Sequence, residues 1–190
     1  MKKVFIVHGF MGSPDGNWFP WLVSELSLQG IAAQALKMPT PYLPKVSEWV
    51  KTIADAIGED FENSYLVGHS LGVPAILRFL ESLSDEKLGG AVLVSGPCEP
   101  LSNIYSKLIN PFLDGGFDFG KIQSRLKNSV VVHGDNDPKV PFVHAEKISK
   151  NLGSKLISIP GGLHLNTKDG GEKYKEFPIV LEELLKMIKK

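Results

Sequence analysis

Residues 64–72 read SYLVGHSLG, and this stretch decides the fold. It joins a short apolar run to the pentad G-x-S-x-G, here Gly68 to Gly72, after which helical spacing begins. The serine of such a strand-to-helix turn adopts a crowded backbone conformation, so glycines are needed two residues to either side. The stretch therefore predicts a strand, a sharp turn that exposes Ser70, and a helix whose N-terminus favours developing negative charge. The plainer alternative is a tight turn whose serine only caps the helix.

Short apolar runs recur on both sides of this turn and are typical of buried strands. They are KVFIVH (3–8), IAAQALKM (31–38), SYLVGHS (64–70), GAVLVSG (90–96), SVVVHG (129–134) and KLISIP (155–160). Segments with helical spacing lie among them, at residues 18–29, 45–58, 71–83, 142–152 and 174–189. Alternating strands and helices predict right-handed crossovers and a mostly parallel sheet covered on both faces, which is a three-layer α/β/α sandwich.

Length and composition set the limits of this fold. A chain of 190 residues predicts a single domain spanning 1–190, and its 43% hydrophobic and 22% charged residues are near the averages of soluble globular proteins. Lys plus Arg and Asp plus Glu both number 21, so there is no excess positive charge for a nucleic acid. We expect neither nucleic-acid binding nor a membrane partner, and the sequence identifies no protein partner.

Cysteine usage and the chain ends point to the cytoplasm. Cys98 is the single cysteine, so no intramolecular disulfide can form, and no Cys or His cluster predicts a metal site or another cofactor. The N-terminal apolar run is too short for a signal peptide. The C-terminal stretch EFPIVLEELLKMIKK could lie on a membrane, but lysines in a last helical turn ordinarily complement the helix dipole.

A serine nucleophile needs a base, and five histidines compete for that role. His164 follows the last strand in a loop at the edge of the sheet where the strands end, which is where catalytic groups of open α/β sheets gather. His8 is expected to shape the loop after the first strand, and His69 points away from the serine beside it. We expect His133 to be buried and neutral, and His144 to be a solvated helix residue.

The acid that orients the base should follow an intervening strand, and HGDNDPKVP (133–141) supplies two candidates, Asp135 and Asp137. A calcium loop is excluded, because Lys139 and Val140 stand where that loop needs Asp or Asn and then Gly. Pro138 restricts Asp137 to an extended conformation, which fixes its direction. Asp135, directly after Gly134, is expected to make an Asx-type turn bond.

These segments together resemble the α/β-hydrolase superfamily, and more closely the small family that includes the retinoblastoma-binding serine hydrolases. The resemblance covers nearly the whole chain and rests on HGFMGSPDGNWFPWL after the first strand, GHSLG, HGDNDPKVP and GGLHLN. The acid loop of that family resembles G-x-x-D-x-x-V-P, which makes Asp137 the implied acid. The resemblance further implies an oxyanion hole formed by the backbone N–H groups of Leu71 and Phe10, with Met11 as the weaker alternative.

The resemblance also implies a reduced sheet of six strands in the order 2-1-3-4-5-6 without a large lid. Met11 and Trp18 are candidates to line an acyl pocket, together with the irregular segment 96–127, although aromatic residues can equally be core.

We therefore expect a carboxylesterase-like serine hydrolase that acts on a small or medium acyl substrate. Ser70 would attack, His164 would shuttle the proton and Asp137 would hold His164, with no cofactor. The alternative is a protein-binding or scaffolding protein on a hydrolase fold whose triad has no physiological use. A dehalogenase-like enzyme is disfavoured because it would need a carboxylate in place of Ser70.

Overall fold

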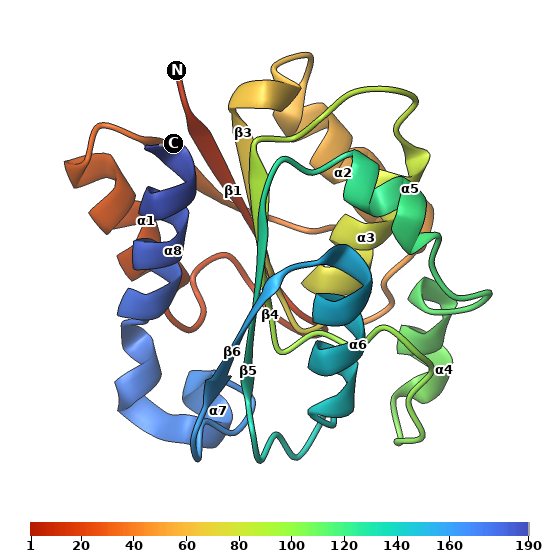
Figure 1. Ribbon diagram of the computed structural model, residues 1–190. Helices are drawn as coiled ribbons and strands as arrows, with labels where there is room; N and C mark the ends of the chain where they lie inside the picture. Colours follow the sequence, from red (N-terminus) through yellow and green to blue (C-terminus); the bar gives the residue numbers. More distant parts are fainter. Residues whose placement is uncertain (190) are drawn as a thin grey trace.

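The computed structural model describes residues 1–189 and is built around a six-stranded parallel sheet in the order β2-β1-β3-β4-β5-β6 (Figure 1). The strands are β1 (Lys3–Val7), β2 (Ala32–Leu36), β3 (Ser64–His69), β4 (Gly90–Val94), β5 (Ser129–Gly134) and β6 (Lys155–Ile159). Each lies within one of the six apolar runs, so the expected strands and their order are confirmed. The central strands β3 and β4 are buried throughout, which explains their continuous apolar sequences.

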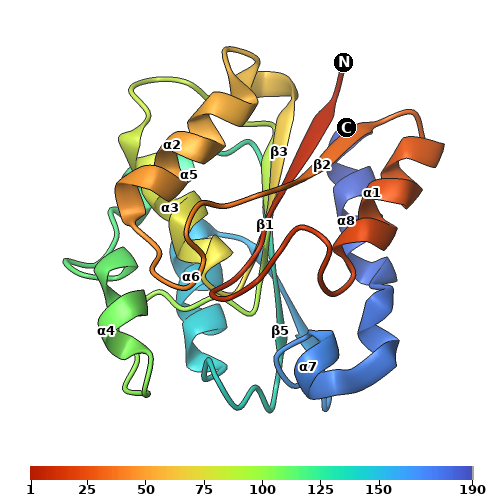
Figure 2. The same ribbon diagram turned by 180° about the vertical axis from the view of Figure 1, so that it is seen from behind.

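Helices cover both faces of the sheet and complete the expected three layers (Figures 1 and 2). One face carries α1 (Phe19–Leu28) and α8 (Pro178–Ile188). The other carries α2 (Val46–Ile57), α3 (Gly72–Ser82), α5 (Phe119–Ser124) and α6 (Val143–Leu152). Each face has its own hydrophobic core, with Trp18, Leu22 and Val180 in the first and Trp49, Ile53 and Ile148 in the second.

The strand order reverses direction between β1 and β3. The chain leaves β1 for the edge strand β2, then returns past β1 to β3 and continues in the opposite direction. Connections that follow β1 and β3 therefore diverge at the C-terminal ends of these strands, where open α/β sheets bind ligands. These ends point toward the lower part of Figure 2, the side on which α7 (Thr167–Gly170) lies.

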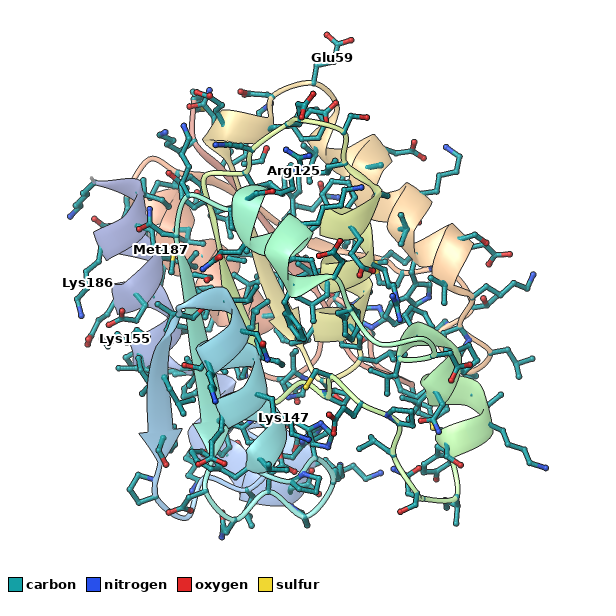
Figure 3. All side chains as sticks on the ribbon, turned by 45° about the vertical axis from the view of Figure 1, so that its right-hand side comes forward. Glu59, Arg125, Lys147, Lys155, Lys186 and Met187 are labelled. Atoms are coloured by element: carbon teal, nitrogen blue, oxygen red, sulfur yellow. The ribbon has the colours of Figure 1, made fainter. Side chains whose placement is uncertain are left out.

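Helix α8 covers the sheet with an ordinary amphipathic face. Pro178 opens its first turn, and Val180, Leu184 and Met187 are buried against the core. Glu183 is 4% exposed, and its Oε1 accepts from Lys155 Nζ at 2.9 Å and Lys186 Nζ at 2.7 Å. Figure 3 shows Lys155, Lys186 and Met187 side by side at this flank. No helix within residues 1–189 is long and apolar enough to cross a membrane.

Segment 96–127, expected to be irregular, contains short helices between β4 and β5. These are α4 (Ser106–Ile109), the 3-10 turn η2 (Asn110–Phe112) and α5. Long-range hydrogen bonds hold the segment: Arg78 of α3 donates from Nε to Phe112 O at 2.9 Å and from Nη2 to Asp114 O at 2.7 Å. The Asn110 amide bonds both the N–H and the C=O of Leu101. These contacts fix α4 beside the C-terminal ends of the strands. The remaining 3-10 turns are η1 (Phe61–Asn63) and η3 (Gly171–Lys175).

Candidate active site

Ser70 lies at the sharp turn between β3 and α3, with φ at +55°. A non-glycine residue rarely adopts this left-handed conformation, and it turns the side chain out of the strand direction. The Ser70 N–H donates to Val94 O of the neighbouring strand at 2.9 Å, which anchors the turn to the sheet. The predicted strand, turn and helix are therefore all present.

Close packing around this turn explains its glycines. A Cβ atom on Gly72 would lie 2.1 Å from Val7 O, and one on Gly68 would lie 2.8 Å from Ile76 Cδ1. A Cβ on Gly9, in the loop after β1, would lie 2.9 Å from Ser70 Cβ. Backbone from β1 and from the serine turn can approach this closely only because side chains are absent. The turn and the loop after β1 therefore form one packed unit.

His164 and Asp137 complete a continuous hydrogen-bonded chain with Ser70. His164 Nε2 lies 3.0 Å from Ser70 Oγ, and His164 Nδ1 lies 2.7 Å from Asp137 Oδ2. The carboxylate accepts, so Nδ1 carries the proton and Nε2 presents the lone pair to the serine hydroxyl; this tautomer is assigned from the network. The arrangement has the geometry of a nucleophile, a base and an orienting acid.

The Asp137 carboxylate is buried but well supplied with donors. Its Oδ1 accepts from the backbone N–H groups of Lys139 at 2.8 Å and Val140 at 3.0 Å. Burial pushes the pKa of Asp137 upward, but the hydrogen bond and charge of His164 and these two amides outweigh burial and hold the pKa below its usual value. Asp137 is therefore ionised at neutral pH and can stabilise a protonated His164.

His133 flanks the same carboxylate from β5. It is fully buried; its Nε2 donates to Val140 O at 2.9 Å and lies 3.4 Å from Asp137 Oδ2. Burial lowers the pKa of His133. This agrees with the expectation of a buried neutral histidine, and it places a polar N–H beside the acid.

The loop that carries His164 is bound to the acid loop through two neighbours of Asp137. Asp135 Oδ1 accepts from Gly161 N and Asn136 Oδ1 accepts from Leu163 N, both at 2.8 Å. The expectation of an Asx-type turn bond for Asp135 is therefore wrong. Asp137 itself makes the bonds to its own turn, because its Oδ1 faces the N–H groups that follow it. Asp135 instead fastens one loop to the other.

Three more side chains bind carbonyl groups of the His164 loop. Tyr174 Oη donates to Gly162 O at 2.7 Å, His69 Nε2 to His164 O at 2.9 Å, and Trp18 Nε1 to Leu165 O at 3.0 Å. His164 is flanked by two residues with left-handed φ, Leu163 at +56° and Leu165 at +49°. Such conformations persist only where surrounding contacts impose them. The backbone of the candidate base is thus held on both sides.

Trp18 and His144 are both buried, which contradicts the roles expected for them from the sequence. Trp18 is fully buried against Phe19 and Phe177 and does not line the cavity that opens over Ser70, which corrects the expectation that it is a pocket residue.

His144 is 5% exposed, so the expectation that it is solvated is wrong. It lies on the sheet-facing side of α6, and its Nδ1 accepts from Cys98 N at 3.3 Å. Burial lowers the pKa of His144 and raises the pKa of the Cys98 thiol to about 12.

The loop after β1 presents a free amide beside the serine. Met11 N donates to Pro41 O at 3.0 Å, whereas the N–H groups of Phe10 and Leu71 have no acceptor among residues 1–189. His8 shapes this loop as expected: its Nε2 accepts from Met38 N at 3.3 Å, so its Nδ1 carries the proton and donates to Gly9 O at 2.9 Å. Burial lowers the pKa of His8, which keeps it neutral.

A cavity of about 560 Å³ opens over Ser70 and His164. Phe10 and Met11 line it, as does segment 96–127 through Leu101, Ile104 and Tyr105. Sequence reasoning named this segment but not these residues, and it missed the polar lining residues Asn17, Lys139, Asn166 and Lys168. The signal for these lining residues in the sequence was their position in irregular stretches next to the motif residues. Among residues 1–189, no three His, Cys, Asp or Glu side chains converge as a metal site.

The parallel sheet, the serine turn and the adjoining histidine and aspartate define an α/β-hydrolase, and the chain belongs to the serine hydrolase family, whose profile matches residues 4–184. It is similar to YdeN of Bacillus subtilis, named as a hydrolase, with 37% identity over 184 residues that cover 96% of this chain and 94% of the relative.

Solved structures agree with this assignment. The crystal structure of the ydeN gene product from B. subtilis superposes with a TM-score of 0.92 and 35% identity, covering 100% of both chains. Est1E from Butyrivibrio proteoclasticus superposes with a TM-score of 0.76 and 18% identity, covering 100% of this chain and 89% of Est1E. At that identity, Est1E supports the fold alone.

Proposed function

We propose that this serine hydrolase is a carboxylesterase-type enzyme that cleaves small or medium acyl esters through an acyl-enzyme. The observation that carries the proposal is the continuous contact from Ser70 Oγ to His164 Nε2 at 3.0 Å and from His164 Nδ1 to Asp137 Oδ2 at 2.7 Å. A serine hydroxyl is a weak nucleophile until such a base accepts its proton. The cavity of about 560 Å³ falls in the size range of small-molecule sites.

In the proposed reaction, Ser70 Oγ attacks the acyl carbon while its proton passes to His164 Nε2. His164 then gives this proton to the leaving alcohol oxygen as the acyl C–O bond breaks. Asp137 stays ionised and holds the imidazolium in place. Water, activated by His164, attacks the acyl-enzyme, and release of the acid returns Ser70 to its starting state.

The negative charge of the tetrahedral intermediate needs donors in place before the reaction. The N–H groups of Phe10 and Leu71 are the proposed pair, because neither has an acceptor within residues 1–189 while the Met11 N–H is bound to Pro41 O. Removing one such donor typically lowers turnover about a hundredfold to a thousandfold. A reaction of this kind requires no cofactor. We also propose a cytoplasmic location, where the buried Cys98 thiol would remain reduced.

Covalent labelling by a fluorophosphonate probe tests the proposal. Folded wild-type protein should be labelled, and Ser70→Ala should not be. Ser13→Ala is the matched control, because Ser13 lines the same cavity but lies outside the Ser70–His164–Asp137 chain, so labelling should persist. Absence of labelling in folded wild-type protein would contradict the proposed esterase function. It would favour the alternative, a non-catalytic binding protein on a hydrolase fold.

A further inference from the structure

The cavity lining divides into an apolar set and a polar set that come from different segments. Loop 10–11 and segment 97–109 supply the apolar set, Phe10, Pro97, Leu101, Ile104, Tyr105 and Ile109, and the segment adds one polar residue, Asn103. Residues 13–17, 138–140 and 164–168 supply the polar set, Asn17, Lys139, Asn166, Thr167 and Lys168, beside the apolar Pro138 and Val140. The two sets would therefore contact different parts of one bound substrate.

Each set is held together by its own contacts. In the apolar set, the rings of Phe10 and Tyr105 lie 5.2 Å apart between centroids. In the polar set, Asn17 Oδ1 accepts from both Thr167 N and Thr167 Oγ1 at 3.1 Å. Lys139 Nζ lies 2.6 Å from Asp169 Oδ2, which joins the acid loop to α7. Hydrogen bonds and an ion pair therefore hold the polar set, while the packing of Phe10 on Tyr105 joins the loop after β1 to segment 97–109.

The position of His164 decides which part of an ester meets which set. In acyl transfer the leaving group must lie within reach of the base, because His164 Nε2 gives it a proton. Asn166–Lys168 follows His164 after the buried Leu165, and the acid loop beside it carries Lys139. The leaving group therefore lies against the polar set, and the acyl chain is left to the apolar set.

The polar set carries one uncompensated positive charge. Lys139 is paired with Asp169, so its charge is largely neutralised locally. Lys168 is exposed, lines the cavity and has no carboxylate within 4.0 Å among residues 1–189. A negatively charged group on the leaving alcohol would be attracted to Lys168, and the attraction would weaken with salt because the site is open to water.

We propose that the substrate is an ester that joins an apolar acyl group to an alcohol bearing a negative charge, and that Lys168 is a specificity-determining residue. This inference rests on the proposed esterase function. Ser70 would take the acyl group, and the anionic alcohol would leave with the proton from His164. One unit charge at an exposed position changes the preference by about threefold, and reversing it changes the preference by about tenfold.

Two esters with the same acyl group and different leaving-group charge test the inference. The butanoyl esters of 3-hydroxybenzoic acid and 3-hydroxybenzamide differ in charge at similar size. The wild-type ratio of kcat/KM, anionic over neutral, should be about three at low ionic strength and fall toward one in high salt. Lys168→Glu should bring the ratio below one. Lys150→Glu is the matched control, because Lys150 is exposed on α6 and lies away from the cavity, so this variant should keep the wild-type ratio.

The acyl half of the inference has its own measurement. Hexanoyl esters should be hydrolysed faster than acetyl esters, and Ile104→Asn should reduce that advantage without changing the charge ratio, since Ile104 belongs only to the apolar set.

Two results would overturn the inference while leaving the esterase intact: a wild-type charge ratio at or below one, or a ratio that Lys168→Glu leaves unchanged. Failure to hydrolyse either ester, together with absent fluorophosphonate labelling, would overturn the esterase function and this inference with it.

Discussion

The imidazole Nε2 of His69 lies 2.9 Å from the main-chain carbonyl oxygen of His164. The residue before the proposed nucleophile therefore holds the backbone of the proposed base. Burial, reinforced by the nearby charge of His164, lowers the pKa of His69 to about 3 although the hydrogen bond to His164 opposes this. His69 is consequently neutral in ordinary buffers, and its single N–H stays committed to this bond.

Truncating His69 should affect both stability and turnover. His69→Ala leaves the His164 carbonyl unbonded and a cavity beside it, so the free energy of unfolding should fall by roughly 2–4 kcal/mol. The kcat of ester hydrolysis should fall about tenfold as the base loses its fixed position. Urea unfolding and steady-state kinetics measure these effects. His69→Gln, which can still donate to the carbonyl, should recover much of the lost stability and much of the lost kcat. Wild-type stability and kcat in His69→Ala would show that His69 does not hold the backbone of His164.

Acid should destabilise the protein well before its carboxylates are protonated. Burial holds the pKa of His8, His69, His133 and His144 below the ordinary value of 6.5 in the folded chain. Below about pH 6.5 the unfolded chain binds more protons than the folded one, so the free energy of unfolding falls as the pH falls. The loss contributed by His69 continues down to about pH 3.

Urea unfolding at pH 7, 6 and 5 measures this loss. In His69→Gln the slope of stability against pH near pH 5 should be smaller than in wild type by about 1.4 kcal/mol per pH unit, which corresponds to one proton. An unchanged slope in this variant would show that His69 is not the neutral buried group described above.

The two aspartates of the acid loop should respond differently to the same substitution. Asp137→Asn presents an amide to His164 Nδ1 and stabilises the wrong tautomer, so kcat should fall about ten-thousandfold while the fold persists. Asp135→Asn retains an Oδ1 that can accept from Gly161 N, so kcat should stay within about twofold of wild type. If Asp135→Asn were the damaging change instead, Asp137 could not be the acid. Initial rates with one ester and a circular-dichroism check of folding suffice for the comparison.

A methyl group at Gly72 should be poorly tolerated. Its Cβ would lie 2.1 Å from Val7 O, so β1 and α3 would have to separate, and the free energy of unfolding should fall by roughly 4 kcal/mol or more. Gly120→Ala is the matched control, because its Cβ would meet only Asp118 Oδ1 at 3.5 Å, an ordinary contact in helix α5. That change should stabilise the protein by up to about 1 kcal/mol. Thermal unfolding of both variants tests the pair, and equal melting temperatures would refute the packing argument.

The sequence predicted the sheet because its strands carry their own signal. Each central strand is buried on both faces, so its run is apolar throughout, and SYLVGHSLG couples one such run to a turn with a steric requirement. The face of a helix was also readable in principle. His144, Ile148 and Leu152 recur at four-residue spacing and share the buried face of α6, so the solvated interpretation of His144 overlooked an available pattern.

Other features depend on contacts that sequence spacing does not reveal. Asp135 bonds Gly161 from 26 residues away, and Trp18 bonds Leu165 from 147 residues away. Neither partner can be inferred from local turn chemistry. The short helix α4 is held by the Asn110 and Arg78 contacts rather than by its own propensity, since isolated four-residue helices are not stable.

The close approach of Gly9 to Ser70 and of Gly72 to Val7 also affects how this site can diverge among relatives. The proposed oxyanion donors are main-chain atoms of Phe10 and Leu71, and the packing at Gly9 and Gly72 fixes their spacing. Substitutions at position 10, whose side chain is half-buried and lines the cavity, would therefore reshape the cavity mouth while preserving the donor pair, whereas Leu71 is held in the core. The constraint on the donor pair would fall on Gly9 and Gly72, which have no side chain, and selection for new substrates would act on the side chain of Phe10.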